Sequence, residues 1–518
     1  MSTPDLDALP ARAHHCIRDW AARTPDRPAV QDPDRRLTYG ELWRAIERAA
    51  ATLREAGVRP GDRVLLLCEN TVATVVYVFA CHRLDAWASL VNARVPLAEA
   101  GRLRAVAAPR LRVYAIDGSP AAAEHARADR GRRVEDDLLP PAVLGEVDTQ
   151  AAPEPVHQEG ARQVALMMFT SGTTGQPKGV MISHRGLLNA GASIAMSRAI
   201  VPEDCVYGVA PMPHITGFSS VMASLYAGAS MRLLPRFDAA DLAAAIVSGA
   251  IQHFSLVPAG YARLLEHARR HGIDLTRHRI KTMVAAGAPL DPTLKRNVEA
   301  LFGTTLGNAY GLTEFAPGAR VPPGRISPAE SVGFAEGGAQ MRIVDLDGRD
   351  VAEGAIGELW LSGPAMMLGY YRNPEATAQA MRPGGWFATG DLVQRLGNGE
   401  IALVGRRKEM IIRSGFNVYP VEVEAAINEH LDVAQSAVVG RKAADGNEEI
   451  IAYVQRVPGA GLTEAALRAH VGTLLAPYKR PSRIVFMDAL PIGPTGKIWK
   501  VKLAEQAAGL PPGGGAGA

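Results

Sequence analysis

Short runs of apolar residues recur along this chain, and stretches of helical character separate them. One run is Arg63–Cys68, and the others are Gln163–Phe169, Met283–Ala286 and Met341–Val344. A strand without a polar face is buried on both sides, as in a parallel sheet that helices cover. The pattern therefore predicts an α/β fold in which helix-covered sheets make up most of the chain.

The residues before the first run follow the period of a helix. Leu42, Ile46, Ala49 and Leu53 fall on one face, and Gly57 follows as a stop signal. This segment predicts a helix whose apolar face packs on the sheet.

The chain is too long for one core, because 518 residues exceed what a single hydrophobic core covers. We expect a large N-terminal domain over residues 1–407 and a small α+β domain over 408–508. Residues 509–518 should form a disordered tail, because Pro511–Ala518 contains almost only Gly, Ala and Pro. The small domain is predicted to contain helices from Pro420 and over Thr463–Leu475, with strands at Ser436–Val439, Glu449–Gln455 and Ile484–Met487.

Charge and cysteine usage exclude several classes of protein. Lys plus Arg outnumber Asp plus Glu by only 56 to 53, so nucleic acid and anionic membranes are not expected partners. No uncharged apolar run is long enough to span a bilayer, and the N-terminus lacks the apolar core of a secretory signal. The four cysteines form no Cys-x-x-Cys pair, which favours free thiols in a reducing cytoplasm.

The strongest local motif is the segment Thr170–Gly179, directly after an apolar run. Its glycines allow a close approach to phosphate oxygens, its hydroxyl side chains add donors, and Lys178 adds a positive charge. The motif is not a Walker loop, because Gly179 rather than Ser or Thr follows Lys178. A flexible surface turn is the alternative interpretation. The candidate phosphate-binding residues are Thr170, Ser171, Gly172, Thr173, Thr174, Gly175 and Lys178.

With this motif the chain resembles the acyl-adenylate-forming superfamily, which includes acyl-CoA synthetases, adenylation domains of nonribosomal peptide synthetases and firefly luciferase. The resemblance extends in order from Leu37–Leu42 to Pro494–Lys497. It implies that a carboxylic acid reacts with ATP and Mg²⁺ to give an acyl-adenylate, and that the acyl group then passes to coenzyme A. It also implies that the small domain is mobile.

The resemblance assigns the nucleotide and the metal to two further segments. Asn308–Glu314 is similar to the adenine and metal segment, in which Tyr310 would stack on adenine, Thr313 would bond the α-phosphate and Glu314 would ligate Mg²⁺. Gly287–Pro289 is similar to the other adenine face. The implied nucleotide-binding residues are Gly287, Ala288, Pro289, Asn308, Ala309, Tyr310 and Gly311.

The C-terminal half of the resemblance implies a moving site. Asp391 and Arg406 resemble the ribose clamp, and Lys408 occupies the family's hinge position. Gly415 resembles the loop that lines the thiol tunnel, although Ser414 replaces the glycine usual before it. Lys497 resembles the catalytic lysine that meets the α-phosphate and the carboxylate, and Lys479 resembles a contact to the CoA nucleotide.

The acyl pocket is implied around His214, which resembles the residue that gates it. No Lys or Arg lies between Tyr207 and Phe218, and the Asp that holds an α-amino group in amino-acid-activating relatives is absent there. These features favour a monocarboxylic acid with an apolar or aromatic body, and a second carboxylate near Arg320 or Arg325 is the minor alternative. The other candidate pocket residues are Tyr207, Ile215, Thr216, Phe218, Gly311, Ala316 and Pro317.

Three functions compete on this evidence. The first is an acyl-CoA synthetase, and the second is a ligase that loads an acyl carrier protein. The third is a nucleotide-binding protein without catalysis, which the presence of Glu314 and Lys497 disfavours. The sequence does not specify the acid, the pathway or the oligomeric state.

Overall fold

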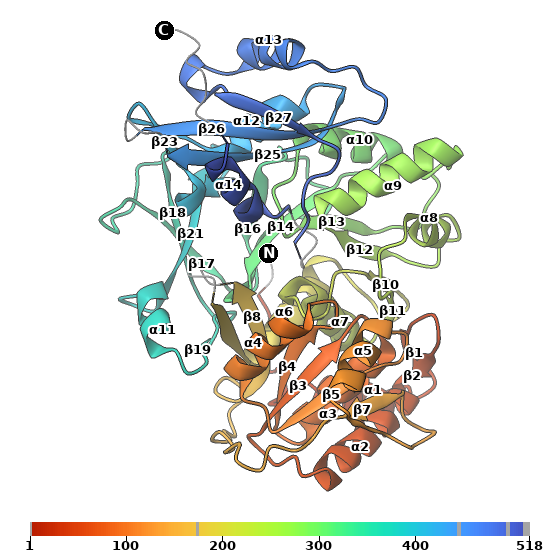
Figure 1. The fold of residues 1–518 in the computed structure, drawn as a ribbon. Coiled ribbons are helices and arrows are strands. Elements are labelled where there is room, and N and C mark those ends of the chain that lie inside the picture. Colours follow the sequence, from red (N-terminus) through yellow and green to blue (C-terminus); the bar gives the residue numbers. More distant parts are fainter. Residues whose placement is uncertain (1–2, 172–175, 443–446, 494–497, 511–518) are drawn as a thin grey trace.

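The computed structural model of the chain describes residues 3–171, 176–442, 447–493 and 498–510. Two large sheets with their helices form most of the molecule, and a smaller C-terminal unit, blue in Figure 1, lies at one end. The predicted α/β fold with an α+β C-terminal unit is therefore confirmed.

The first sheet has parallel strands at its centre and antiparallel strands at both edges. Two predicted apolar runs, Arg63–Cys68 and Gln163–Phe169, supply its strands β3 and β8, which confirms both. In spatial order its strands are β19 (Gly369–Tyr370), β9 (Pro177–Ser183), β8 (Val164–Ser171), β4 (Trp87–Asn92), β3 (Arg63–Cys68), β5 (Leu111–Ala115), β7 (Ala142–Leu144) and β6 (Arg132–Arg133).

The second sheet is parallel from β1 to β14, which includes β13 with the predicted run Met283–Ala286, and it is antiparallel beyond β14 and at its other edge, where β2 pairs with β1. In spatial order its strands are β17 (Gln340–Val344), β18 (Ile356–Ser362), β21 (Trp386–Arg395), β22 (Ile401–Arg406), β16 (Ser331–Ala335), β15 (Phe315–Arg320), β14 (Gly307–Leu312), β13 (Thr282–Ala286), β12 (His253–Leu256), β10 (Cys205–Gly208), β11 (Ser230–Leu233), β1 (Pro28–Gln31) and β2 (Arg36–Thr38), and β20 (Met381–Arg382) pairs with β21.

The prediction of a parallel sheet is wrong for one of the four apolar runs. Met341–Val344 lies in β17, which pairs antiparallel with β18 instead of joining a parallel sheet. Turns rather than a helix connect these two strands, so no crossover returns the chain to a parallel position. Consistent with an edge strand, only Ile343 and Val344 of this run are buried.

Helices cover both sheets, and local sequence signals fix several of their ends. Thr38 and Glu41 form a capping box at the start of α2, and the predicted face Leu42, Ile46, Ala49 and Leu53 is fully buried. The helices of this part are α1 (His15–Arg23), α2 (Tyr39–Glu55), α3 (Val72–Arg83), α4 (Leu97–Ala107), α5 (Pro120–Ala128), α6 (His184–Ser197), α7 (Ile215–Ala227), α8 (Ala239–Val247), α9 (Pro258–His271), α10 (Pro292–Phe302) and α11 (Pro374–Ala380).

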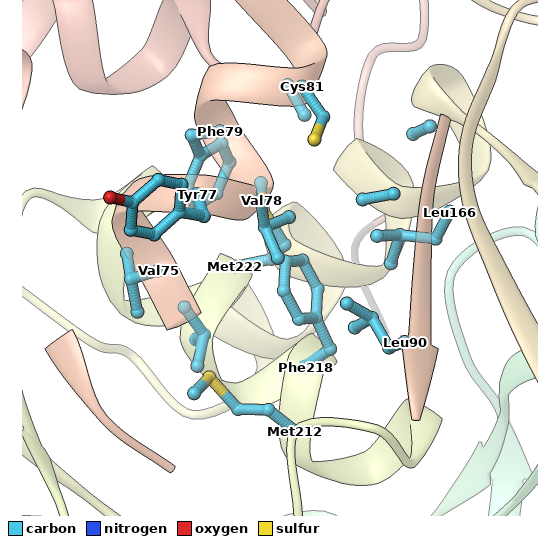
Figure 2. Packing of buried hydrophobic residues seen from close by; sticks show 14 of the residues in the cluster. Val75, Tyr77, Val78, Phe79, Cys81, Leu90, Leu166, Met212, Phe218 and Met222 are labelled. Carbon is cyan, nitrogen blue, oxygen red and sulfur yellow. The ribbon is translucent and has the colours of Figure 1, made fainter. Parts of the chain in front are cut away.

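The centre of the largest hydrophobic core is α3, which is buried on every side except at its last residue. Figure 2 shows Val78 of this helix among Leu90 of β4, Leu166 of β8, and Phe218 and Met222 of α7. A helix that is apolar all round fits only such an interior position. This core therefore connects the first sheet with the helices α6 and α7. It also includes residues of β10 and β11 in the second sheet.

A single turn of 3-10 helix, η1 (Arg407–Glu409), connects β22 to the C-terminal unit. Its predicted helices and strands all occur, within a few residues of the expected limits. They are β23 (Ile411–Arg413), β24 (Phe416–Val418), α12 (Pro420–Asn428), β25 (Val433–Lys442), β26 (Glu448–Arg456), α13 (Glu464–Leu474), η2 (Pro477–Lys479), β27 (Arg483–Met487) and α14 (Lys500–Ala508). At its end the Leu510 carbonyl accepts a hydrogen bond from Arg441 at 2.8 Å, and residues 511–518 of the predicted tail lie outside the described residues.

Two sequence expectations about the whole chain meet the structure here. Within the described residues, no helix is both long enough and apolar enough to cross a membrane. The thiols of Cys16, Cys68, Cys81 and Cys205 are all free, and the first three are buried.

Buried histidines link α3 to α6. The His82 and His184 rings meet edge to face with centroids 4.9 Å apart, and the Ala165 carbonyl lies 3.1 Å from His82 Nε2. Burial lowers the pKa of His82 from its ordinary 6.5 to about 3, and it lowers the pKa of His184 as well. Both rings are therefore neutral in the folded protein at any pH above their lowered values.

These pKa values predict acid sensitivity. Between pH 6.5 and about pH 3, the unfolded chain binds a proton at His82 that the folded chain does not bind. The free energy of unfolding should therefore fall with decreasing pH in this range, by about 1.4 kcal/mol per pH unit for each such histidine. Urea unfolding at a series of pH values measures this slope.

His82→Gln should reduce the slope, because glutamine can donate to the Ala165 carbonyl without titrating. His271→Gln is the matched control at an exposed position of α9. An unchanged slope for His82→Gln would contradict this origin of the acid sensitivity.

Candidate active site

The strands β8 and β9 flank the predicted phosphate loop as an antiparallel pair. Thr170 at the end of β8 lies opposite Lys178 of β9. Four predicted residues of the loop, Gly172, Thr173, Thr174 and Gly175, lie outside the described residues, and Ser171 is described only as the last residue of β8. The structure therefore defines the positions of Thr170 and Lys178, the residues on either side of this loop.

Tyr370 connects the phosphate strand to the predicted metal ligand. The Lys178 Nζ atom lies 4.7 Å from the centroid of the Tyr370 ring, on the neighbouring strand β19. The hydroxyl of the same tyrosine donates a hydrogen bond of 2.9 Å to Glu314 Oε1. One side chain thus holds the lysine of the phosphate segment and the carboxylate of the metal segment in fixed relation.

Glu314 and Thr313 form the turn between β14 and β15. Both side chains are partly exposed, and the Met367 amide fixes the Glu314 backbone by donating to its carbonyl at 2.9 Å. Tyr310, on β14, lies four residues before Glu314, so the predicted adenine platform and the predicted metal ligand share one hairpin. Of the remaining residues in this segment, Ala309 is partly buried and Gly311 is exposed.

A buried carboxylate joins this hairpin to the edge of the second sheet. Tyr310 donates to Asp391 Oδ2 at 2.6 Å, and the Arg406 Nε atom lies 2.8 Å from Asp391 Oδ1. Burial raises the pKa of Asp391 above its ordinary value, while Arg406 and Tyr310 oppose that rise. Asp391 and Arg406 are opposite each other on β21 and β22, so the predicted ribose clamp is a cross-strand pair.

The predicted segment Gly287–Pro289 lies beside this hairpin. It follows β13, whose residue Ala286 is paired with Ala309 of β14, and Gly287 has a φ of +86°. That backbone angle is costly for any residue with a Cβ atom, so a glycine is required where the chain turns next to the predicted adenine site.

Asn308 has a structural role in this arrangement. Its side chain is buried, and its Nδ2 atom donates to the carbonyls of Ala329 and Ser331, both at 3.0 Å. The amide therefore ties β14 to the segment that leads into β16, and both of its donor hydrogens are used there.

The predicted acyl pocket divides into exposed and buried residues. His214 caps the N-terminus of α7, with Nδ1 accepting from the Thr216 amide at 3.3 Å, and both residues are partly exposed. Tyr207 and Phe218, in contrast, are almost fully buried and belong to two separate cores. They therefore contribute to the packing of these cores in the structure.

The residues before and after Lys408, the predicted hinge residue, form ion pairs. Arg406 is bound to Asp391, and Arg407 Nη1 lies 3.0 Å from Glu358 Oε2 on β18. On the other side Glu409 Oε2 lies 3.5 Å from Lys500 Nζ, which also lies 2.7 Å from Glu424 Oε1 on α12. Lys408 is the exposed residue between these two sets of anchors.

The predicted thiol-binding residues lie together on the C-terminal unit. Ser414 and Gly415 form the turn between β23 and β24 with φ angles of +51° and +80°, and Gly415 is exposed. Directly after it, the Phe416 ring stacks on Tyr478 with centroids 4.5 Å apart. Lys479 Nζ lies 2.5 Å from Glu422 Oε1. The predicted catalytic Lys497 lies outside the described residues.

The sequence did not reveal Tyr370, Glu358 or Lys500. Their partners lie 56, 49 and 91 residues away, at Glu314, Arg407 and Glu409 respectively. Contacts between residues so far apart in the sequence produce no pattern of local spacing from which they could be predicted. A possible signal was the adjacent pair Tyr370–Tyr371 after a glycine, because two tyrosines in succession are costly to place without hydrogen-bond partners.

Comparisons with known proteins give matches over most of the chain. The model of the AMP-binding enzyme family matches residues 17–371, and the model of the AMP-binding enzyme C-terminal domain matches residues 422–497. The chain is 33% identical to a 2-succinylbenzoate–CoA ligase of Geobacillus kaustophilus strain HTA426, over 94% of this chain and 96% of the relative. It is also 33% identical to a feruloyl-CoA synthase of an Amycolatopsis species, over 93% of this chain and 97% of the relative.

A solved structure extends the comparison to the arrangement of the whole chain. ATP-bound MatB from Rhodopseudomonas palustris matches with a TM-score of 0.83 and 28% identity, covering 96% of this chain and 99% of that one. The arrangement described here therefore resembles that of an ATP-bound protein.

The role of Tyr370 leads to a prediction about Mg²⁺. In Tyr370→Phe the ring over Lys178 remains, but Glu314 loses the hydroxyl that orients it. Loss of such an outer contact typically costs 10- to 100-fold in metal affinity. In pyrophosphate exchange, the Mg²⁺ concentration for half-maximal rate should therefore rise by about tenfold or more.

Tyr371→Phe is the matched control, because that neighbouring hydroxyl donates to Glu154 at 2.6 Å instead. Equal Mg²⁺ requirements for the two variants would remove Tyr370 from the metal site.

The anchors around Lys408 lead to a second prediction. Lys500→Met should leave Glu409 and Glu424 without their shared cation, and it should loosen the arrangement that resembles the ATP-bound form. Formation of the adenylate should then slow by about tenfold, because correct positioning supplies much of the rate. Thioester formation from a supplied acyl-adenylate should slow less.

Lys500→Arg should retain the cation and most of the adenylation rate. Lys502→Met is the control at an exposed position of the same helix. If Lys500→Met and Lys502→Met slowed both half-reactions equally, Lys500 would not position the hinge.

Proposed function

The chain belongs to the AMP-binding enzyme family, and from that membership and the geometry above we propose that it is an AMP-forming acid–CoA ligase. In the first half-reaction, the carboxylate of an acid attacks the α-phosphate of ATP and expels pyrophosphate. In the second, the thiol of coenzyme A attacks the acyl carbon and expels AMP. The observation that carries this proposal is the linked set of contacts from Lys178 through Tyr370 to Glu314, and from Tyr310 through Asp391 to Arg406.

These contacts bring together groups that are complementary to a nucleotide. The Tyr310 ring offers a flat surface to adenine beside the Gly287–Pro289 turn, and Asp391 can accept hydrogen bonds from the ribose hydroxyls. Lys178 supplies a positive charge toward the phosphates. Positioning two anions and neutralising their charge is most of what this transfer requires.

Glu314 fits a magnesium ion that is held mainly by phosphates. One of its oxygens accepts from Tyr370, which leaves lone pairs on both oxygens of a partly exposed carboxylate. Magnesium in such sites is bound through one or two carboxylates together with substrate phosphates, and it neutralises charge that develops there.

We further propose the division into domains 1–407 and 408–508, with Lys408 as the pivot. Rotation there would leave Arg406 and Arg407 bound to the large domain and Glu409 bound to the small one. One orientation would bring Lys497 to the α-phosphate, and the other would bring Gly415 to the acyl carbon. Lys479, close to the Gly415 loop, would then face the nucleotide part of coenzyme A.

Coenzyme A rather than a carrier protein is the proposed acceptor. The two relatives described above are named as a CoA ligase and a CoA synthase, and a carrier protein finds no support among them. Assays with free coenzyme A and with a phosphopantetheinylated carrier protein distinguish the two. The proposed location is the cytoplasm, because free thiols are typical of a reducing compartment.

The two-step mechanism predicts separable half-reactions. Lys497→Ala should abolish acyl-adenylate formation, because the charge that meets the carboxylate and the α-phosphate is lost. Thioester formation from a supplied acyl-adenylate and coenzyme A should remain within a few-fold of the wild-type rate, because AMP is then the leaving group. Pyrophosphate exchange measures the first half, and release of AMP measures the second.

Lys502→Ala is the control, since Lys502 is an exposed lysine close in the sequence. If Lys497→Ala abolished both half-reactions in a folded protein, the assignment of this lysine to the first step would be wrong.

A further inference from the structure

Two arginines are buried beside β15 without enough partners. Arg320 ends β15 and is 2% exposed, and Arg198 caps the C-terminus of α6 and is 5% exposed. Arg320 Nε lies 2.9 Å from Glu336 Oε2, but its Nη1 atom has no hydrogen-bond partner among the described residues. The Nε atom of Arg198 has none either, and Arg198 forms no ion pair in the described part of the chain.

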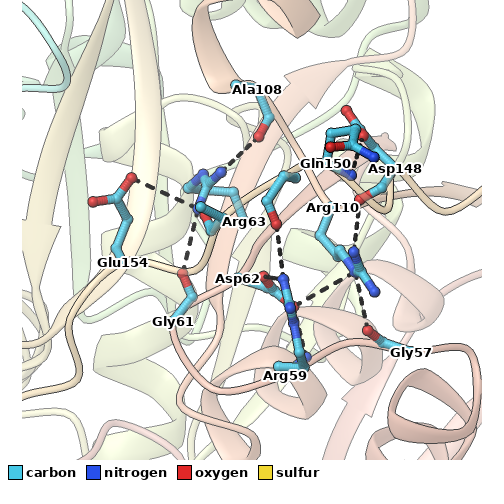
Figure 3. A network of polar contacts seen from close by, with 12 residues as sticks. Gly57, Arg59, Gly61, Asp62, Arg63, Ala108, Arg110, Asp148, Gln150 and Glu154 are labelled. Carbon is cyan, nitrogen blue, oxygen red and sulfur yellow. Dashed lines mark hydrogen bonds and ion pairs between the residues drawn. The ribbon is translucent and has the colours of Figure 1, made fainter.

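Elsewhere in the chain a fully buried arginine is satisfied. Figure 3 shows Arg63, whose guanidinium reaches the Ala108 carbonyl and approaches Glu154. It also donates to the Ala107 and Ala152 carbonyls. Arg198 and Arg320 thus differ from Arg63, and an unsatisfied buried charge calls for a physical explanation.

The charges around Arg198 do not balance. Two guanidinium groups face a single carboxylate, and Glu336 is already occupied by Arg320 at Oε2 and by the Ser197 hydroxyl, 2.6 Å from Oε1. Burial, together with the charge of Arg320, lowers the pKa of Arg198 from 12.5 to about 9. A buried positive charge without a counter-charge is strongly destabilising, so an anion would complete this cluster.

Further hydrogen-bonding groups with unused donor hydrogens lie on α6 and α9. Among the described residues, the Ser193 hydroxyl of α6 has no partner, and the Tyr261 hydroxyl of α9, which interacts with Arg198 electrostatically, donates to none. Each can donate a hydrogen bond to an anion. Together with Arg198 and Arg320 they form the buried arginine cluster.

The cluster borders the predicted acyl pocket. Arg320 lies three residues beyond Pro317 on β15, and α6 packs against both β15 and α7, the helix that His214 caps. A Cβ atom on Gly337 would lie 2.7 Å from Ser193 Oγ and 3.1 Å from Pro317 Cγ, so Ser193 and Pro317 of the predicted pocket both pack against Gly337. The far end of a bound acid would therefore point toward the cluster.

We propose that the buried arginine cluster binds a second carboxylate of the acid substrate, so that the protein activates dicarboxylic acids. This inference rests on the proposed function and specifies its substrate class. Of the two arginines that the sequence suggested for a second carboxylate, Arg320 belongs to the cluster, whereas Arg325 is paired with Glu400. Arg198 is the additional residue that the structure supplies.

Pyrophosphate exchange with matched acids tests the proposal. The pairs are hexanoate with adipate, octanoate with suberate, and 3-phenylpropanoate with 3-(2-carboxyphenyl)propanoate. The wild type should prefer the diacid of at least one pair by about 100-fold in kcat/KM, because a site built for a polar group rejects an analogue that lacks it. Arg198→Met should reduce this preference by at least about tenfold, mainly through the KM for the diacid, and Arg198→Lys should restore part of it.

Two controls separate binding from a structural role. Arg269→Met, at an exposed position of α9, should leave the preference unchanged. The melting temperature of ligand-free Arg198→Met should equal or exceed that of the wild type, because an apolar side chain replaces an uncompensated charge. A lower melting temperature would mean that Arg198 is satisfied within the fold, and it would overturn the proposal.

The outcomes also separate this inference from the proposed function. Exchange with monoacids alone, unaffected by Arg198→Met, would overturn the diacid site and leave the ligase activity standing. Absence of exchange with every acid of the panel would count against both.

Discussion

The buried carboxylate of Asp391 is the interaction on which the candidate site depends. It holds Tyr310 at 2.6 Å and Arg406 at 2.8 Å, and so joins the β14–β15 hairpin to the strand that ends at the hinge. Burial alone would favour the protonated form of Asp391, whereas the contacts with Arg406 and Tyr310 stabilise its ionised form. The same group that fixes the proposed adenine platform therefore fixes Arg406, next to the last residue of the proposed large domain.

This coupling explains how one site could serve two reactions. The ion pairs of Arg406 and Arg407 hold the chain on the large domain, and the pair of Glu409 with Lys500 holds it on the small one. A change of backbone angles at Lys408 would break none of these contacts. Motion at Lys408 would redirect the proposed small domain as a rigid body, which is the usual form of hinge closure around a ligand.

Much of the fold could be predicted from the sequence, because its signals are local. The runs at Arg63–Cys68 and Met283–Ala286 have no polar face, and such strands fit only a covered parallel sheet. Met341–Val344 has the same short-range pattern, and only its partner β18 reveals that it is an antiparallel edge strand. The motif residues could be named because they follow a family order. Tyr370 and Arg198 could not, because their roles arise from contacts made by distant segments and from burial that no spacing encodes.

The central claim is that the carboxylate of the acid attacks the α-phosphate of ATP in this site. Its most direct test uses an acid that supports turnover, labelled with ¹⁸O in both carboxylate oxygens, together with ATP, Mg²⁺ and coenzyme A. Mass spectrometry of the products then follows the label. The account predicts one ¹⁸O atom in the phosphate of AMP and none in pyrophosphate. Label in inorganic phosphate, with ADP as the nucleotide product, would show attack at the γ-phosphate and would contradict the account.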